Sequence, residues 1–320
     1  MLAFDVFNGD ADGLCALQQL RLSQPIDSIL ITGVKRDISL LKKVKAAVGD
    51  VVTVLDISLD KNRESLISLL ESGAQVSYFD HHFAGDIPVH PGLQVHIDLG
   101  TETCTSAMVN DFLNGHSRSW AVVGAFGDNL TSVAQRLAEP LGLAADRLAS
   151  LRQLGECLNY NAYGETVQDL YFHPAELSQR MRPHADPIAF IHDDSIFTTL
   201  RTGYAEDMAK AKALQPERET AGGAVYFLPD AMWSRRVSGV FSNQLASDHP
   251  RRAHAILSHN SVNGYTVSVR APLVNMSGAD DLCRQFATGG GRKGAAGINN
   301  LPEEALTRFF TQFTSAYPVL

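Results

Sequence analysis

Short apolar stretches with the composition of β-strands alternate with stretches of helical spacing through the first hundred residues. The strand-like segments are 2–7, 28–32, 51–57, 75–80 and 93–99, and the helical segments between them are 13–23, 39–48 and 61–72. Such alternation predicts right-handed βαβ units. The expected fold class is therefore α/β, with a parallel sheet flanked by helices.

Beyond residue 100 the pattern becomes helical, over 103–113, 120–126, 133–138 and 145–158. Three prolines between His173 and Asp194 suggest a linker, and 195–214 suggests one connecting helix. Further strands (224–228, 253–258, 265–272) and helices (234–247, 279–286, 303–316) predict a smaller C-terminal α/β domain. We therefore expect a first domain at 1–190, a linker and connecting helix at 191–215, and a second domain at 216–320.

The net charge of −8 argues against a protein that coats long DNA or RNA, because such proteins carry a basic footprint. It leaves room for a small anionic partner held by a local basic patch. No segment approaches the ~18 consecutive apolar residues of a membrane span, and no basic segment precedes the first apolar run, so a cytoplasmic location is expected. The four scattered cysteines predict neither disulfides nor a zinc site. The sequence leaves homodimer formation open.

Acidic side chains and imidazoles follow several of the apolar runs. They are Asp10 and Asp12 in NGDADG, Asp56 after VVTVL, Asp80, His81 and His82 after VSYF, and Asp128 in GAFGDN. In an open parallel sheet, ligands bind outside the carboxyl ends of the strands. We therefore expect at least four carboxylates and two imidazoles to converge there.

Carboxylates that lie this close raise one another's pKa and resist ionisation unless cations neutralise them. Carboxylate sites suit Mg²⁺ or Mn²⁺, and an imidazole in the set favours Mn²⁺. Two such ions ~3.5–4 Å apart activate water and hold a phosphoryl group. One aspartate after a strand is more often a helix cap, but caps do not account for four such positions and an Asp-His-His triplet. We expect two Mn²⁺ ions, with Mg²⁺ as the alternative.

The order of these motifs, NGDADG, LDIS, DHH and GDN, resembles that of the DHH phosphoesterase superfamily. The segment CTSA at 104–107 is similar to the start of a helix in that family. The segment GGGRKGAAG at 289–297 is similar to the glycine-rich signature of its DHH-associated substrate domain. The resemblance covers nearly the whole chain and implies a metal-dependent hydrolase acting on phosphoric ester bonds.

The resemblance also implies roles for single residues. Asp10 and Asp56 would hold one metal ion, and Asp12, Asp56, His81 and Asp128 would hold the second, with Asp56 bridging the two. His82 would act on the transferred phosphoryl group by hydrogen bonding or proton transfer. Asp80 would orient an imidazole. A water molecule between the ions would be the nucleophile.

Two positions depart from the family pattern near the first motif. Several branches carry a histidine where this chain has Val6, and the single-strand exonuclease branch carries an aspartate where it has Asn8. Asn8 offers a carbonyl oxygen that could complete the first metal site with one negative charge fewer. It is equally typical of a turn.

The resemblance assigns substrate binding to the C-terminal domain. Arg270 and Arg292 would contact phosphate or the terminal base, and the backbone of Gly289, Gly290 and Gly291 would approach the ligand closely. Arg292 stands where oligonucleotide-cleaving members carry histidine, although an arginine can still hold phosphate in a bidentate manner.

The function expected is hydrolysis of short linear nucleotides to mononucleotides, either dinucleotides of the pGpG type or very short oligonucleotides. The role implied is the clearance of short RNA fragments (nanoRNA) or of products of nucleotide signalling. Three alternatives stay open: a cyclic dinucleotide phosphodiesterase, an inorganic pyrophosphatase, and a nucleotide sensor that binds without turnover.

Overall fold

The computed structural model describes residues 1–318. The chain folds as two compact units, Met1–Thr202 and Gly203–Leu320. The change from one unit to the other falls inside helix α9 (Ser195–Lys212), the connecting helix that the sequence predicted. Each unit has its own sheet and its own hydrophobic core.

The first unit contains a five-stranded, fully parallel sheet with the strand order β2-β1-β3-β4-β5. The strands are β1 (Ala3–Phe7), β2 (Ile29–Ile31), β3 (Val51–Leu55), β4 (Gln75–Asp80) and β5 (Leu93–Ile97). Because every neighbouring pair is parallel, the carboxyl ends of all five strands lie along one edge. The predicted fold class is confirmed.

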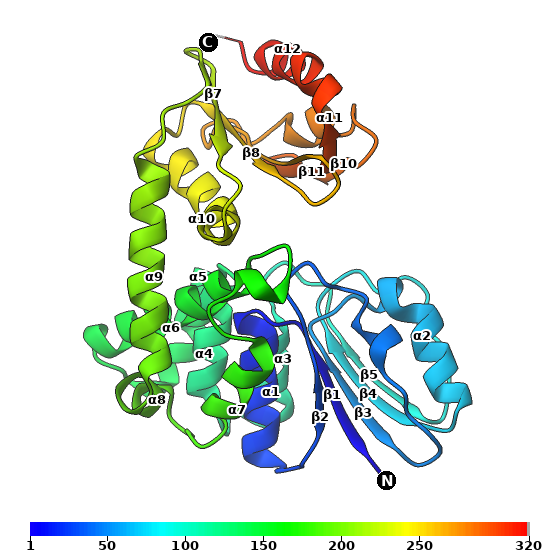
Figure 1. The fold of residues 1–320 in the computed structure, drawn as a ribbon. Helices are drawn as coiled ribbons and strands as arrows, with labels where there is room; N and C mark the ends of the chain where they lie inside the picture. The colour runs from blue at the N-terminus through cyan, green and yellow to red at the C-terminus, as the bar shows by residue number, and fades with distance from the viewer. Residues whose placement is uncertain (319–320) are drawn as a thin grey trace. The chain divides into compact units, whose positions relative to one another are not determined.

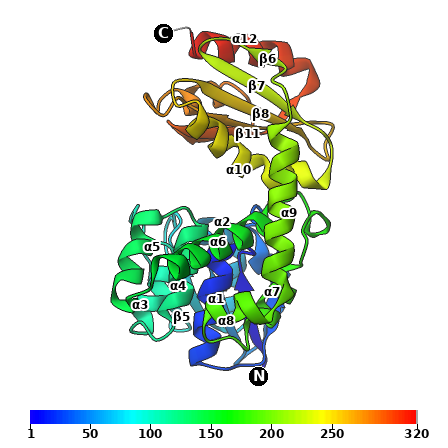
Figure 2. The same cartoon turned by 90° about the vertical axis from the view of Figure 1, so that its left-hand side faces the viewer.

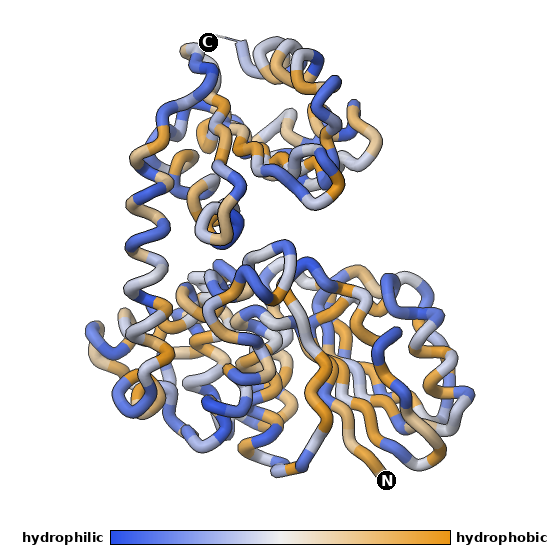
Figure 3. Tube along the Cα trace, in the orientation of Figure 1, coloured by the Kyte–Doolittle hydropathy of each residue, from blue (hydrophilic) through white to orange (hydrophobic). Residues whose placement is uncertain are grey.

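Alternate residues of the strands face different layers, as the period of two requires. Val6, Val54 and Tyr78 pack under α2 (Leu59–Glu71), whereas Phe7 and Leu55 pack against the other helices. The helices of this second layer include α1 (Ala11–Ser23), α3 (Thr105–Phe112), α4 (Arg118–Gly127), α5 (Thr131–Ala138) and α6 (Ala145–Ala162). Figure 1 shows these helices on one side of the sheet and α2 on the other. Figure 3 shows the strands between them as largely hydrophobic.

The helix expected over 39–48 is wrong. The segment forms one 3-10 turn, η1 (Leu40–Lys43). The buried Asn62 side chain accepts a hydrogen bond from the Leu41 N–H and donates one to the Ile38 carbonyl. These bonds satisfy backbone groups locally, and a helix through this segment would have to break them.

The linker expected over 173–194 is also wrong, because this segment contains helices α7 (Pro174–Met181) and α8 (Pro187–Asp193). In each helix proline stands in the first turn, where its missing N–H costs nothing. His173 and Asp186 cap the two helices. Their apolar side chains, Leu177, Met181 and Phe190, are buried in the main core. Two further 3-10 turns are η2 (Glu139–Leu141) and η3 (Val167–Asp169).

The second unit contains a mixed sheet, with α12 on one face and α10 on the other (Figure 2), as expected of a smaller α/β domain. Its strands are β6 (Arg218–Glu219), β7 (Gly223–Leu228), β8 (Ala253–His259), β9 (Gly264–Arg270), β10 (Gly289–Arg292) and β11 (Ala295–Pro302), in the order β10-β11-β9-β8-β7-β6. Its helical elements are α10 (Met232–Asp248), α11 (Ala279–Cys283), η4 (Glu303–Ala305) and α12 (Leu306–Ala316). The short hairpin β10–β11 was not predicted.

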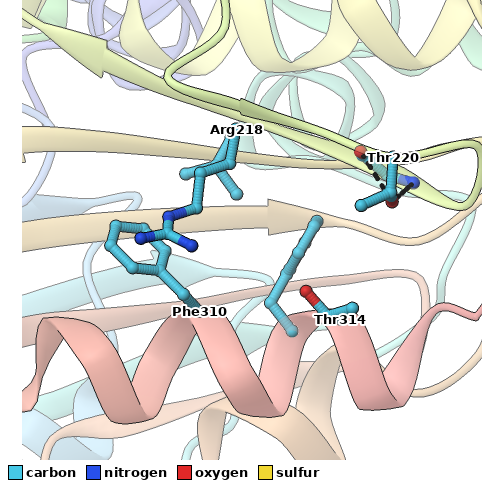
Figure 4. Close-up of a pocket in the computed structure, with 7 residues that line it drawn as sticks. Arg218, Thr220, Phe310 and Thr314 are labelled. Carbon is cyan, nitrogen blue, oxygen red and sulfur yellow. Dashed lines mark hydrogen bonds between the residues drawn. The ribbon is translucent and has the colours of Figure 1, made fainter.

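A small cavity lies between α12 and the β6–β7 edge of the second sheet (Figure 4). The Arg218 guanidinium covers the Phe310 ring at 4.4 Å from the ring centroid. The cavity volume is about 10 Å³, at the lower limit for one water molecule. It is therefore a packing gap and not a ligand site.

Within residues 1–318, no helix has the length and apolar character needed to cross a membrane.

Candidate metal centre

The carboxyl edge of the first sheet gathers the acidic residues that the sequence singled out. Asp10 follows β1 and caps α1, Asp56 follows β3, and Asp80 ends β4. Asp128 arrives from a different element, since it stands at the C-terminal end of α4. Asp10, Asp56 and Asp80 are at most 2% exposed, so this is a buried cluster of acids.

Asp12 is fixed by the start of α3. Its Oδ2 accepts a hydrogen bond from the Thr105 N–H at 2.7 Å, and its Oδ1 accepts one from the Ser106 N–H at 2.8 Å. The positive end of the α3 dipole thus faces a negative charge. The Thr105 hydroxyl donates to Asp56 Oδ1 at 3.2 Å. The CTSA segment therefore orients two carboxylates of the cluster.

Asp56 lies at the centre of the cluster in a strained backbone conformation. Its φ of 59° is in the left-handed region, which residues other than glycine seldom adopt. Burial, followed by the charges of Asp10, Asp12 and Asp128, raises the pKa of Asp56 well above its usual range. Burial also raises the pKa of Asp128 to about 6. The cluster holds more negative charge than the protein alone stabilises, which is the condition that a bound cation relieves.

His81 faces three carboxylates at once. Its Nε2 lies 3.4 Å from Asp56 Oδ1 and 4.0 Å from both Asp12 Oδ2 and Asp128 Oδ2. Asp12, His81 and Asp128 each offer a ligand atom, and these three atoms lie within 4.8 Å of one another. Oxygen ligands with one imidazole nitrogen fit Mn²⁺ or Mg²⁺. The donor set therefore fits a divalent cation.

His82 is oriented by Asp80. The distance from His82 Nδ1 to Asp80 Oδ1 is 2.7 Å, and the His82 side chain is 46% exposed whereas Asp80 is buried. Burial lowers the pKa of His82, but the hydrogen bond and charge of Asp80 outweigh it and raise that pKa above 6.5. His82 also belongs to a second possible ligand group, with Asp56 and His81.

Asn8 is engaged in the turn after β1. Its Oδ1 accepts the Asp10 N–H at 3.3 Å, and its Nδ2 donates to the Lys35 carbonyl at 3.3 Å. The local geometry is thus that of a turn-forming asparagine. Whether Asn8 also contributes to a metal site stays a prediction.

Lys35 was not expected in this cluster. It follows β2, whose carboxyl end lies at the same edge because β2 pairs with β1. Its Nζ lies 2.5 Å from Asp10 Oδ2 and 3.5 Å from Asp128 Oδ1. Burial opposes the charged ammonium, but Asp10 outweighs burial and raises the pKa of Lys35. In the sequence Lys35 is only a lysine shortly after the predicted strand 28–32, and nothing there distinguishes it from a surface residue.

The predicted substrate residues of the second unit lie near one another. Arg270 of β9 and Arg292 of β10 are both register partners of Ala295 in β11. Paired residues of antiparallel strands point to one face, so both arginines lie on the same face, two strand spacings or about 10 Å apart. The Arg270 guanidinium is held by Asn243 and Ser268.

The three glycines whose backbone was expected to approach the ligand closely belong to edge strand β10. A Cβ on Gly289 would lie 1.7 Å from the Cys283 carbonyl oxygen, so packing of α11 against β10 requires a glycine there. The structural role of Gly289 is therefore clear, and the ligand contacts of Gly289, Gly290 and Gly291 stay a prediction.

No protein-family model matches the chain, and no curated protein matches it in sequence. Solved structures do match. The exonuclease RecJ bound to manganese has a TM-score of 0.66 at 17% identity, with 99% of this chain and 90% of that chain covered. RecJ in complex with Mn²⁺ from Thermus thermophilus has a TM-score of 0.63 at 18% identity. That match covers 98% of this chain but only 51% of that one, so this chain spans about half of that RecJ.

A third match is PggH, a pGpG-specific phosphodiesterase from Vibrio cholerae, with a TM-score of 0.57, 12% identity and 99% coverage of both chains. At such identities the likeness concerns the fold. The fold that the resemblance to the DHH phosphoesterase superfamily implied is therefore confirmed over nearly the whole chain.

Proposed function

We propose that this protein is a metal-dependent phosphodiesterase that hydrolyses short linear nucleotides to mononucleotides. The observation that carries the proposal is the convergence of Asp12, Asp56, His81 and Asp128 around one point at the carboxyl edge of the sheet. A second, oriented imidazole stands beside them. This combination provides a cation site together with a proton-transfer group, which hydrolysis of a phosphodiester needs.

Asp12, Asp56, His81 and Asp128 are the residues that would hold the cation, Mn²⁺ or Mg²⁺. A divalent ion bound there would supply the chemistry of such ions, a lowered pKa of water and neutralisation of charge on the phosphoryl oxygens. The protein fixes the ligands in advance, because the α3 amides hold Asp12 and Thr105 holds Asp56. Little reorganisation is then needed when substrate binds.

His82 is the proposed proton donor to the leaving oxygen. Asp80 engages its Nδ1, which leaves Nε2 for the substrate, and the raised pKa keeps the ring protonated closer to neutral pH. Its exposure is that of a group that substrate can reach. Asp80 acts through His82 as a positioning residue.

Short nucleotides are the substrate class that several observations support. The negative net charge disfavours long polymers. Arg270 and Arg292 on one face of the second sheet can bind phosphate groups. Phe83, which follows His82, is 70% exposed and offers a stacking surface for a base. PggH, a protein of the same fold, is described as pGpG-specific.

The test is turnover of a substrate panel with Mn²⁺: a linear dinucleotide, its cyclic form, a short oligonucleotide and pyrophosphate. We expect mononucleotide release from the linear dinucleotide and the oligonucleotide, none after chelation of the metal, and none with the His81→Ala variant. Phosphate release from pyrophosphate alone would make the protein a pyrophosphatase. Opening of the cyclic compound alone would make it a cyclic dinucleotide phosphodiesterase. Tight dinucleotide binding without any product would favour the sensor.

A further inference from the structure

The surroundings of the Lys35 side chain favour a positively charged ammonium group. An ammonium group has three donor hydrogens, and three acceptors surround Nζ: Asp10 Oδ2 at 2.5 Å, Asn159 Oδ1 at 3.3 Å and Asp128 Oδ1 at 3.5 Å. The ring centroid of Tyr163 lies 5.9 Å away. The group that Lys35 contacts most closely, Asp10, is the carboxylate expected to hold the first of two metal ions.

The backbone around Lys35 is anchored on both sides. Its N–H donates to the Ala162 carbonyl at 2.9 Å, and its carbonyl accepts from the Asn8 side chain. The loop that carries Lys35 also packs tightly on the loop that carries Asp10, since a Cβ on Gly9 would lie 2.1 Å from the Gly33 carbonyl oxygen. The backbone that carries Lys35 is therefore held in place next to the loop of Asp10.

Because position 8 is an asparagine and not an aspartate, the surroundings of Asp10 carry one negative charge fewer. An aspartate there could ligate a cation, but the Asn8 amide is engaged with the Asp10 N–H and the Lys35 carbonyl. The chain thus has one potential carboxylate ligand fewer and one cation more on the Asp10 side. On the other side, Asp12, His81 and Asp128 still offer three ligand atoms within 4.8 Å of one another.

We propose that the Lys35 ammonium takes the place of one of the two expected divalent cations, so that the protein binds a single metal ion per chain. This inference rests on the metal site of the proposed function and states how many metal ions that site binds. A divalent ion beside Asp10 would lie next to the ammonium, where two positive charges a few ångströms apart repel each other strongly in a buried site. Lys35 is then a positioning residue that holds Asp10 and supplies positive charge next to the metal.

The test is metal stoichiometry, measured without reference to turnover. The metal-free protein is titrated with Mn²⁺ and followed by native mass spectrometry, calorimetry and electron paramagnetic resonance. We expect one tightly bound Mn²⁺ per chain and the spectrum of an isolated ion. The double variant Asn8→Asp/Lys35→Met, which restores the carboxylate and keeps the alkyl chain, is expected to bind two ions with a spin-coupled spectrum.

Two controls isolate the charge of Lys35. Asn8→Asp alone, which keeps the ammonium, is expected to bind one ion. Lys43→Met removes an exposed lysine that pairs with Asp37 and should leave the stoichiometry at one. Two Mn²⁺ ions in the wild type, or one in the double variant, would overturn the proposal. These readings are independent of catalysis, so failure of the proposed function would appear separately, as a metal-loaded protein that cleaves no substrate.

Discussion

The partly exposed His82 imidazole and the buried Asp80 carboxylate form a hydrogen-bonded pair, with Nδ1 2.7 Å from Oδ1. Asp80 is 0% exposed, and its other oxygen, Oδ2, has no hydrogen-bond partner among residues 1–318. Among the described residues, the hydrogen bond of the Asp80 side chain is therefore to His82 alone. A buried carboxylate that accepts from Nδ1 keeps a proton on that nitrogen of the His82 ring.

Asp80→Asn should therefore damage the chemical step more than substrate binding. Asparagine can still accept a hydrogen bond from Nδ1 but no longer stabilises a positive ring. We expect kcat to fall about 10- to 100-fold with little change in KM. If protonated His82 is the acid, activity declines as pH rises through its pKa. The loss of Asp80 lowers that pKa, so the alkaline limb of the kcat profile should move to lower pH.

Asp98→Asn is the matched control for this pH profile. Asp98 stands just beyond the end of the neighbouring strand β5, is exposed, and within residues 1–318 its side chain accepts a hydrogen bond only from the Gly100 N–H. Its replacement should leave kcat and the pH profile unchanged. An unshifted alkaline limb in Asp80→Asn, with wild-type kcat, would remove His82 from the role of proton donor.

Asp128→Ala and His81→Ala should each abolish turnover while the fold survives. Neither side chain fills the core, and removal of Asp128 relieves crowding among the carboxylates. The measurement is Mn²⁺-dependent turnover together with thermal unfolding. Asp111→Ala, which removes an exposed carboxylate from α3, is the control and should retain activity. Mn²⁺-dependent activity in either site variant would contradict the ligand assignment.

The sheet and the acidic ends of its strands were predictable because they depend on local patterns. Apolar runs of strand length ended in acids at Asp56 and Asp80, and the helices between the first and second strands and between the third and fourth favour parallel pairing. By contrast, 173–194 was misread because its prolines resemble a linker, whereas they open two helices whose apolar faces complete the core.

The contact of Lys35 with the acidic cluster could not be predicted from a local sequence pattern. A lysine after a short strand usually lies on the surface, and its meeting with Asp10 depends on β2 lying next to β1. The same holds for Arg270 and Arg292, which share a face only through the unpredicted strand β11 between them. Contacts that depend on the order of strands in a sheet cannot be read from a single sequence.

Stabilisation by Mn²⁺ should increase with pH. In the metal-free protein the pKa of Asp128 is raised to about 6 and that of Asp56 well above its usual range. The folded state then holds protons that the unfolded state releases, so the stability from these groups is lost as pH rises through the raised pKa values. Metal ions bind the ionised carboxylates and displace these protons.

The gain in Tm on adding Mn²⁺ should therefore be larger at about pH 7.5 than at about pH 5. Differential scanning fluorimetry at fixed Mn²⁺ measures it. Asp128→Asn should reduce both the gain and its pH dependence. Equal gains at both pH values would mean that Mn²⁺ does not bind at these carboxylates.

Arg292→Ala should mainly raise KM. Arg292 is exposed on β10, on the same sheet face as Arg270, and its proposed role is binding of substrate phosphate. We expect an increase in KM of about 10-fold or more, the worth of one charge-assisted contact, with kcat nearly unchanged. Arg251→Ala, at another exposed arginine of the same unit, serves as the control. A loss confined to kcat would place Arg292 at the transition state instead.

His254 should make the second unit sensitive to acid. It is 1% exposed in β8, and neither ring nitrogen has a hydrogen-bond partner among residues 1–318. Burial, followed by the charges of Arg252 and His249, lowers the pKa of His254 to about 4. The unfolded state, with a pKa of about 6.5, binds the proton first. Stability is therefore lost as pH falls from about 6.5 toward 4, by at most about 3 kcal/mol.

His254→Leu should remove this loss, because leucine does not titrate and leaves no unpaired polar atom in the core. We expect a free energy of unfolding at about pH 7.5 equal to or above that of the wild type, and an advantage over the wild type that grows toward about pH 4.5. His259→Leu, which removes the exposed histidine of the same strand, should show no such growing advantage. Urea unfolding across this range measures the difference. A constant difference between His254→Leu and the wild type at every pH would mean that His254 is not buried in its neutral form.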